Sequence, residues 1–319
     1  MRDHSIDSVC GLLIIHVILG HIFQWAHMNS LYSPVALVLS FFMPWFFYKS
    51  GMYYKERPVG VAFELYVRKL IFPYLAFSII GQIFWTIMMF VEGDRVLRHY
   101  MISPFNTLLA EGSLNGNLPL WFLFSLFAVL MCFSLFKKNK LVLCFIALLC
   151  ALILHFTGVV KPYWIANICS GLFFFSIGYY LKERQYRFYL FAISLIATLT
   201  ILLLLPSFVD MRSNALLYGN YVVWYIYSIA AIISINNIFK YLRIPILTKV
   251  FTYIGENSMI FYVLHWIIMT IVMIVSLICN CRGDFAYIAI LANIIILPLM
   301  TYVVKRSNNK YVRLLFGLK

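Results

Sequence analysis

Long apolar stretches, separated by short basic or polar clusters, run along almost the whole chain. A helix that crosses a membrane needs about 20 mostly apolar residues, and ten of these stretches come close to that length. The pattern therefore predicts ten membrane-spanning helices. We place them at residues 9–28, 34–54, 70–91, 119–136, 141–158, 164–181, 188–206, 218–238, 254–278 and 285–304.

Composition agrees with this pattern. Of the 319 residues, 64% are hydrophobic and only 11% are charged, which lies well outside the range of soluble domains. No Ser-, Gly- or Pro-rich linker interrupts the apolar stretches, so we expect one domain over residues 1–319. The predicted fold class is an all-α polytopic membrane protein. It is a bundle of about ten transmembrane helices, followed from about residue 305 by a short basic tail that lies on the inner membrane surface.

The basic residues predict the orientation, because Lys and Arg accumulate in the cytoplasmic loops of membrane proteins. Of the 25 Lys and Arg residues, Lys49 lies inside a predicted span and 19 share one side with both termini. The other side holds only Arg95, Arg98, Lys161, Arg212 and Arg282. Both termini are therefore expected in the cytoplasm. The net charge of +14 follows from this topology and from attraction to anionic lipid, and it needs no nucleic acid as a partner.

The chain shows none of the sequence signatures that mark a nucleotide site, a zinc protease or a serine hydrolase. Cys279 and Cys281 alone make a weak metal motif. Four other cysteines lie within predicted spans, where they act as small hydrophobic residues: Cys132, Cys144, Cys150 and Cys169. We therefore expect no bound metal and no permanently bound cofactor. The chemistry is expected from polar groups inside the membrane.

The first predicted span carries two histidines where lipid is expected. Ionisable groups at membrane depth are costly, so His21 marks a candidate functional site. It shares a helical stripe with Asp7 and Cys10 and lies about 16 Å beyond Cys10, near the middle of the bilayer. A neutral imidazole there can accept a proton from a hydroxyl; the alternative is a histidine that only hydrogen-bonds a neighbouring helix. His16 lies about 140° round the helix from His21, and we interpret it as structural.

The residues from Asp7 to His21 resemble the first-helix signature of the membrane acyltransferase type 3 family. That signature is an Asp-x-Leu-(Arg or Lys)-Gly segment, followed by apolar residues and ending in Gly-His. Asp7 falls on the family aspartate, Gly11 on its glycine and His21 on its catalytic histidine. Four further segments resemble family motifs in the expected order: Phe46-Phe47-Tyr48-Lys49-Ser50-Gly51, Arg68-Lys69-Leu70-Ile71-Phe72-Pro73-Tyr74, Leu120-Trp121-Phe122-Leu123, and Ile254-Gly255-Glu256-Asn257-Ser258 through Tyr262-Val263-Leu264-His265.

The resemblance implies a multi-pass enzyme of the bacterial inner membrane. Such an enzyme moves an acyl group, commonly acetyl, from cytoplasmic acyl-CoA to a sugar hydroxyl. The expected partners are acyl-CoA, a glycan or lipid-linked saccharide, and the lipid bilayer. Acetyl-CoA would be a donor substrate rather than a bound cofactor. Asp7 and His21 would be catalytic residues.

One position departs from the family pattern, because Cys10 stands where the family has Arg or Lys. If that cation normally contacts the phosphates of the donor, Cys10 takes its place in the donor site. Another cation, such as Arg2, Lys49 or Arg68, must then supply the charge. Reduced or lost catalysis is the alternative. A third interpretation makes Cys10 an acyl-carrying nucleophile, since thiolates are good nucleophiles.

Donor and acceptor each have candidate contacts. Arg68 and Lys69 suit the donor phosphates, or else they are a plain basic flank at the start of the third span. Trp121 is suited to stack on a sugar, or else it belongs to an interfacial aromatic belt. The longest outer loop, 92–118, either shapes an acceptor site or is an ordinary solvated loop.

Two hydroxyl groups and one further histidine complete the candidates. Ser50 and Tyr262 are candidates to stabilise an oxyanion, although Ser50 with Gly51 also suits close helix packing. His265 is either a second functional histidine or a packing hydrogen bond.

Two other functions stay open at this point. A secondary transporter for a glycan or polar solute is one, although paired broken helices and internal symmetry are not visible in the sequence. A catalytically silent family member that assists glycan assembly is the other, and Cys10 is the residue that favours it.

Overall fold

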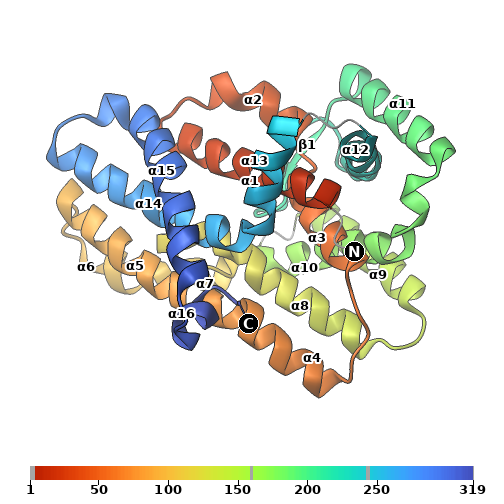
Figure 1. The fold of residues 1–319 in the computed structure, drawn as a ribbon, viewed down its shortest axis with the longest axis horizontal. Helices are drawn as coiled ribbons and strands as arrows, with labels where there is room; N and C mark the ends of the chain where they lie inside the picture. The colour runs from red at the N-terminus through yellow and green to blue at the C-terminus, as the bar shows by residue number, and fades with distance from the viewer. Residues whose placement is uncertain (1–3, 159–160, 242–244, 319) are drawn as a thin grey trace. The chain divides into compact units, whose positions relative to one another are not determined.

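The computed structural model describes residues 4–158, 161–241 and 245–318, so the candidate cation Arg2 lies outside the described residues. Most of the structure is helical (Figure 1). The helices, with a π turn (η1) and three 3₁₀ turns, are α1 (His4–Trp25), α2 (Asn29–Val38), α3 (Phe42–Met52), α4 (Val59–Tyr66), η1 (Val67–Ile71), α5 (Phe72–Glu92), α6 (Leu97–Met101), α7 (Ser103–Glu111), η2 (Asn115–Leu120), α8 (Trp121–Leu135), α9 (Lys140–Phe156), α10 (Tyr163–Leu181), η3 (Arg184–Tyr186), α11 (Phe188–Leu204), α12 (Tyr221–Tyr241), α13 (Pro245–Glu256), α14 (Ser258–Ile278), η4 (Arg282–Asp284), α15 (Phe285–Arg306) and α16 (Lys310–Leu315).

The contacts divide the chain into two compact units. Unit 1 comprises Met1–Leu13, Pro34–Phe63 and Ala128–Glu256, and unit 2 comprises Ile14–Ser33, Glu64–Phe127 and Asn257–Lys319. Helices α1 and α8 each contribute residues to both units. The organisation as one domain stays a prediction.

In unit 1, α3 packs against α10, α10 against α9, and α11 against α12. The first half of α1 approaches α13 until the backbones almost touch. A Cβ atom on Gly11 would lie 2.0 Å from the carbonyl oxygen of Phe251, and one on Gly255 would lie 1.8 Å from that of Asp7. Only glycine fits at these two positions, so Gly11 and Gly255 set how closely the two helices pack.

A buried polar network also holds unit 1 together. The side-chain oxygen of Gln185 accepts hydrogen bonds from the Tyr48 hydroxyl at 3.1 Å and from the Asn236 amide at 2.9 Å. Asn236 in turn accepts from the indole nitrogen of Trp45 at 2.8 Å. All four side chains are fully buried. Because unpaired polar groups are costly at this depth, the network fixes α3 and α12 to the turn that precedes α11.

Unit 2 is organised around α14, which packs against both α5 and α15 (Figure 1). The turn η2 is bonded to two of its neighbours. The Gly116 amide donates to the side-chain oxygen of Gln82 at 3.2 Å, and the Asn117 side chain donates to the carbonyl of Val263 at 3.1 Å. Helix α15 buries a stripe at every fourth residue, which is typical of one helix face packed on a neighbour: Phe285, Ala289, Asn293, Leu297 and Thr301.

Eight helical segments in the described part of the chain are long and apolar enough to cross a membrane, and they cover eight of the ten predicted spans. The other two predicted spans, 141–158 and 188–206, correspond to α9 and α11. These helices have 17 residues each, which is near the lower limit for a span. The prediction of an all-α polytopic membrane protein is confirmed. The cytoplasmic placement of both termini stays a prediction.

The predicted spans were approximate to several residues, and the structure refines them in three places. The second span is interrupted at residues 39–41, between α2 and α3. Arg68 and Lys69 lie in the π turn η1, inside a helical stretch that begins at Val59, and not at the start of a helix. The ninth span begins at Ser258, because Asn257 separates it from α13. Mean hydropathy, averaged over a whole span, does not register such short interruptions.

Two further features were not predicted. The connection from α11 to α12 contains a small antiparallel hairpin, in which β1 (Phe208–Asp210) pairs with β2 (Ala215–Tyr218). The basic tail forms the short helix α16, and Phe316 just beyond it is buried against Phe77 of α5, with 5.1 Å between ring centroids. The end of the tail therefore packs on the protein.

Candidate active site

The second half of α1 carries His21, whose ring lies against two consecutive side chains of α14 within unit 2. The ring stacks on His265, with 5.5 Å between centroids and 17° between planes. It meets Trp266 edge to face, with 5.0 Å between centroids and 87° between planes. His21 is half-buried, while His265 is fully buried and Trp266 is 4% exposed. The structure thus brings together two histidines that were separate candidates in the sequence.

The orientation of the His265 ring is fixed by the backbone. Its Nδ1 lies 2.7 Å from the carbonyl oxygen of Tyr262. Because a carbonyl oxygen can only accept, Nδ1 carries the proton, and Nε2 of the neutral ring presents a lone pair. Within the described residues, neither Nε2 of His265 nor Nε1 of Trp266 has a hydrogen-bond partner. A buried acceptor and a buried donor therefore adjoin His21.

Trp266 is the residue that sequence reasoning missed. It directly follows His265, at the end of a segment that resembles a family motif. Hydropathy treats an indole in an apolar span as one more apolar side chain, although its N–H is an obligatory donor. That donor is the signal by which the sequence alone could have found it.

The two hydroxyl groups expected at an oxyanion site are already engaged. The Tyr262 hydroxyl donates to the carbonyl oxygen of Pro119. Ser50, which lies in unit 1, donates to the carbonyl oxygen of Phe46 at 2.9 Å. Each hydroxyl has a single proton to give, so both donors are used within the protein.

Two other candidates pack inside unit 2. His16 is 5% exposed, and its Nδ1 lies 2.8 Å from the hydroxyl oxygen of Tyr32, on which its ring also stacks. Trp121 is 5% exposed and packs edge-on against Phe122. These contacts favour a packing role for both residues, since neither presents a ring face to solvent.

Asp7 and Cys10 lie in the half of α1 that belongs to unit 1, where they are 6% and 1% exposed. Protein therefore encloses the Cys10 thiol. Asp7, His4 and Glu256 place one ligand atom each within 4.8 Å of one another. An imidazole and two carboxylates are a donor set that suits divalent transition metals. No other cluster of this kind occurs in the part of the chain that the structure describes.

The two candidate donor-binding cations of η1 are not covered by protein. Arg68 and Lys69 are both exposed, and Arg68 pairs with Glu64 at 3.0 Å, one turn earlier in the helix. Both members of this pair are 68% exposed. Isolated π turns interrupt regular helices, frequently at functional sites. Lys49, the other cation considered, lies 5.5 Å from the ring centre of Trp45.

Lys140 behaves unlike an ordinary loop cation. It is 7% exposed at the start of α9, where its ammonium group pairs with Glu56 and lies 4.8 Å from the ring centre of Phe133. The rings of Tyr54 and Tyr179 are 5.3 and 5.0 Å away. The hydrogen bond from Lys140 lowers the pKa of Glu56. In the sequence, Lys140 was only one of the basic residues that predict which side is cytoplasmic. The structure places its ammonium group in an aromatic cage.

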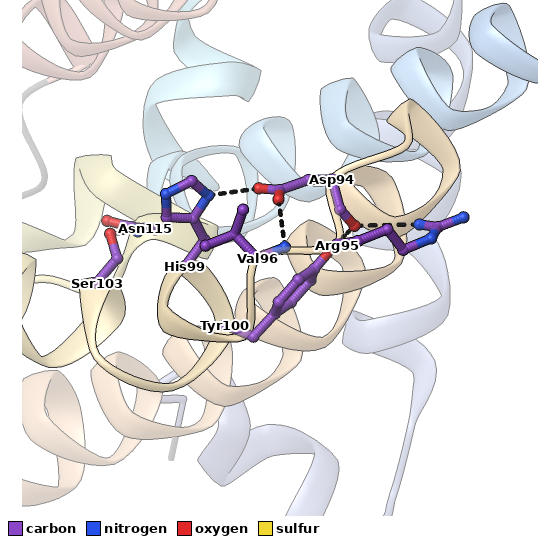
Figure 2. Close-up of polar contacts among 7 residues, drawn as sticks. All are labelled: Asp94, Arg95, Val96, His99, Tyr100, Ser103 and Asn115. Atoms are coloured by element: carbon purple, nitrogen blue, oxygen red, sulfur yellow. Dashed lines mark hydrogen bonds and ion pairs between the residues drawn. The ribbon is translucent and has the colours of Figure 1, made fainter.

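The outer loop 92–118 is tied together by its own hydrogen bonds (Figure 2). The Asp94 carboxylate accepts from the Val96 amide at 2.9 Å and lies 2.6 Å from Nδ1 of His99. The Asp94 carbonyl accepts from the Tyr100 hydroxyl at 2.6 Å. The amide of Val96 first, and then His99, lower the pKa of Asp94. These bonds order the segment from Asp94 to Tyr100.

Comparison with protein families shows what this arrangement belongs to. The sequence model of a family described as an acyltransferase domain matches residues 3–305, from the start of α1 almost to the end of α15. The chain belongs to the acyltransferase 3 family. It is therefore a multi-pass membrane acyltransferase, and the match includes both His21 and His265. A search of curated proteins and a search of solved structures each returned no match.

Proposed function

We propose that this acyltransferase moves an acetyl group, or a related acyl group, from acyl-CoA to a hydroxyl of an envelope or exported glycan. It works in the inner membrane of a bacterium and takes its donor from the cytoplasmic side. One observation carries the proposal. His21, which falls on the catalytic histidine of the family signature, lies against a buried acceptor and a buried donor on α14.

In this mechanism His21 acts as the general base. The acceptor hydroxyl oxygen attacks the thioester carbonyl carbon and forms a C–O bond, while the hydroxyl proton moves to the imidazole. When the C–S bond breaks, the proton passes from His21 to the departing thiolate. The products are a sugar ester and a free thiol. General base catalysis of this kind contributes about 10²–10⁴-fold in rate.

His265 has a different part in the proposal. Its Nε2 is a lone-pair acceptor whose tautomer is set by the Tyr262 carbonyl. A sugar places a second hydroxyl next to the reacting one, and that second hydroxyl is suited to donate to Nε2. His265 then orients the acceptor, while His21 takes the proton.

Arg68 and Lys69 are proposed to bind the donor phosphates. Both side chains are exposed in the π turn, and charge-assisted hydrogen bonds from cations to phosphate are among the strongest that side chains make. The Glu64 partner of Arg68 is itself exposed, so giving it up for a phosphate costs little.

The second candidate function is a catalytically silent family member. The burial of Cys10 favours it, because a thiol 1% exposed supplies no cation in place of the family Arg or Lys. A transporter is the third class, and it predicts no dependence on acyl-CoA.

The test is acyl transfer by membranes that contain the wild-type chain, His21→Ala or His16→Gln, with radiolabelled acetyl-CoA and mass spectrometry of surface glycans. We expect label on glycan with wild type and with His16→Gln, and loss of label with His21→Ala. His16 is the matched control because it is a second histidine on the same helix, buried and hydrogen-bonded to Tyr32. Label that persists in His21→Ala contradicts the proposed base, and no transfer by wild type favours the silent member.

A further inference from the structure

Two buried polar atoms of opposite character occur at consecutive positions of α14. His265 is fully buried and Trp266 is 4% exposed. Nε2 of the first and Nε1 of the second have no hydrogen-bond partner within the described residues. Native proteins pair the great majority of their buried polar groups, so each exception needs an explanation. Here two such atoms belong to consecutive residues whose rings both contact the ring of His21. They point to a ligand that forms the missing hydrogen bonds.

The Trp266 atom is the more specific of the two. An indole Nε1–H is a donor only, so its partner must be an acceptor. A carbonyl oxygen, and still more an oxyanion, is such an acceptor. The residue meets His21 edge to face with 5.0 Å between ring centroids, so the indole that carries this donor adjoins the proposed base.

The other donors considered for an oxyanion do not have a proton to spare. The Tyr262 hydroxyl is bonded to the Pro119 carbonyl, and the Ser50 hydroxyl to the Phe46 carbonyl. A donor contributes to catalysis in this way only if it is aimed at the charge that develops in the transition state. Trp266 retains its proton for that purpose.

We propose that Trp266 is a catalytic residue whose indole N–H binds the carbonyl oxygen of the acyl thioester and stabilises the oxyanion. The inference rests on the proposed function, because it takes His21 as the base. When the hydroxyl oxygen bonds to the carbonyl carbon, the C=O π electrons move to oxygen, and that negative charge accepts the hydrogen bond from Trp266. When the oxyanion collapses, its electron pair re-forms the C=O bond and the C–S electron pair leaves on sulfur. The thiolate then takes the proton held by His21.

The surroundings suit this role. Water weakens hydrogen bonds to a developing charge, whereas a dry site strengthens them. Trp266 packs edge-on against Trp25, with 5.0 Å between centroids, and Trp25 stacks near Phe285 at 6.1 Å. These rings hold the indole in place and exclude water from it.

The experiment compares Trp266→Phe with Trp85→Phe in the full-length, detergent-solubilised protein. Phe keeps an aromatic ring and removes the N–H. Trp85 is the control because it is a half-buried indole of α5 in the same unit and takes no part in the proposed site. We expect kcat for acetyl transfer to fall about 10²–10³-fold in Trp266→Phe, the usual effect of deleting one oxyanion donor. KM for acetyl-CoA should change little, and Trp85→Phe should resemble wild type. An unchanged kcat in Trp266→Phe overturns the inference.

A second measurement separates this inference from the proposed function. In protein labelled with ¹⁵N at the indoles of its seven tryptophans, Trp266→Phe assigns one N–H signal. We expect acetyl-CoA to shift that signal and to leave the Trp85 signal, assigned in the same way from Trp85→Phe, unchanged. If wild type transfers acetyl but the Trp266 signal does not move, the inference fails alone. If wild type transfers nothing, the proposed function fails, and an unmoved signal then overturns the inference as well.

If Trp266→Phe fails to fold, 3-benzothienylalanine at the same position provides a replacement. It has the shape of tryptophan with sulfur in place of the N–H. Thermal unfolding equal to wild type, combined with the same loss of kcat, supports the catalytic role. Equal unfolding with full kcat contradicts it.

Discussion

Two histidines in unit 2 make the same kind of hydrogen bond in opposite surroundings. His99, in the outer loop, has its Nδ1 2.6 Å from the Asp94 carboxylate and a side chain that is 50% exposed (Figure 2). His265 has its Nδ1 2.7 Å from a backbone carbonyl and is fully buried. In both, an acceptor on one side of the ring leaves the other nitrogen for a different partner.

The difference lies in what that other nitrogen meets. Water reaches an exposed imidazole and satisfies it, so the pair of Asp94 and His99 is complete without a ligand. Water does not reach the Nε2 of His265, and an unmet buried acceptor costs about 1–3 kcal/mol. Under the proposed function, burial, and not the hydrogen bond to Nδ1, is what assigns His265 to a site that the substrate completes.

The largest expected difference comes from replacing each of the two histidines, one at a time, with leucine. His265→Leu should lower kcat about 10²-fold, within the range for a lost contact to a reacting partner. The midpoint temperature of its thermal unfolding should not fall, because leucine removes the unpaired Nε2 along with the hydrogen bond to Tyr262. His99→Leu should keep the wild-type kcat. Turnover assays and thermal unfolding in detergent measure both. Equal losses of kcat in the two variants would contradict a separate role for the buried histidine.

A smaller effect is expected on the outer loop as the pH falls. The pKa of Asp94 is lowered by the Val96 amide and by His99, so its stabilising contribution is present above the ordinary Asp pKa of about 3.9. It is lost as the pH falls through the lowered folded-state value. Hydrogen exchange of residues 92–103, corrected for intrinsic rates, should therefore rise at low pH.

Asp94→Asn provides the control for that experiment. It removes the titrating carboxylate, so the loop should exchange faster than wild type near pH 7 and change less on acidification. A wild-type loop whose protection stays constant to pH 2 would contradict the assignment of its order to Asp94.

The smallest effect is expected from the ion pair between Glu92, at the start of the loop, and Arg282 in η4. The side chains are 41% and 58% exposed, and exposed pairs contribute only about 0–1 kcal/mol. A double-mutant cycle on unfolding, with Glu92→Gln and Arg282→Gln, should give a coupling energy in that range that shrinks with added salt. A coupling above about 2 kcal/mol would be inconsistent with a solvent-screened pair.

The spans were predictable and their interruptions were not. A run of about 20 apolar residues has few alternatives to a membrane helix, so the hydropathy pattern alone locates the helices. The break at residues 39–41 lies within an apolar stretch, and the two cations of the π turn at Val67–Ile71 look in the sequence like an ordinary basic flank. Packing against neighbouring segments decides such features, and a single sequence does not show which segments are neighbours.

The sequence by itself determined that this protein is a multi-pass membrane acyltransferase, because apolar length requires the membrane and ordered motifs identify the family. It also singled out His21, since an ionisable group at membrane depth is costly without a function. Only the tertiary structure paired His21 with His265 and revealed Trp266. Those residues are 244 and 245 positions away along the chain, and whether a buried nitrogen has a partner depends on what the fold places beside it.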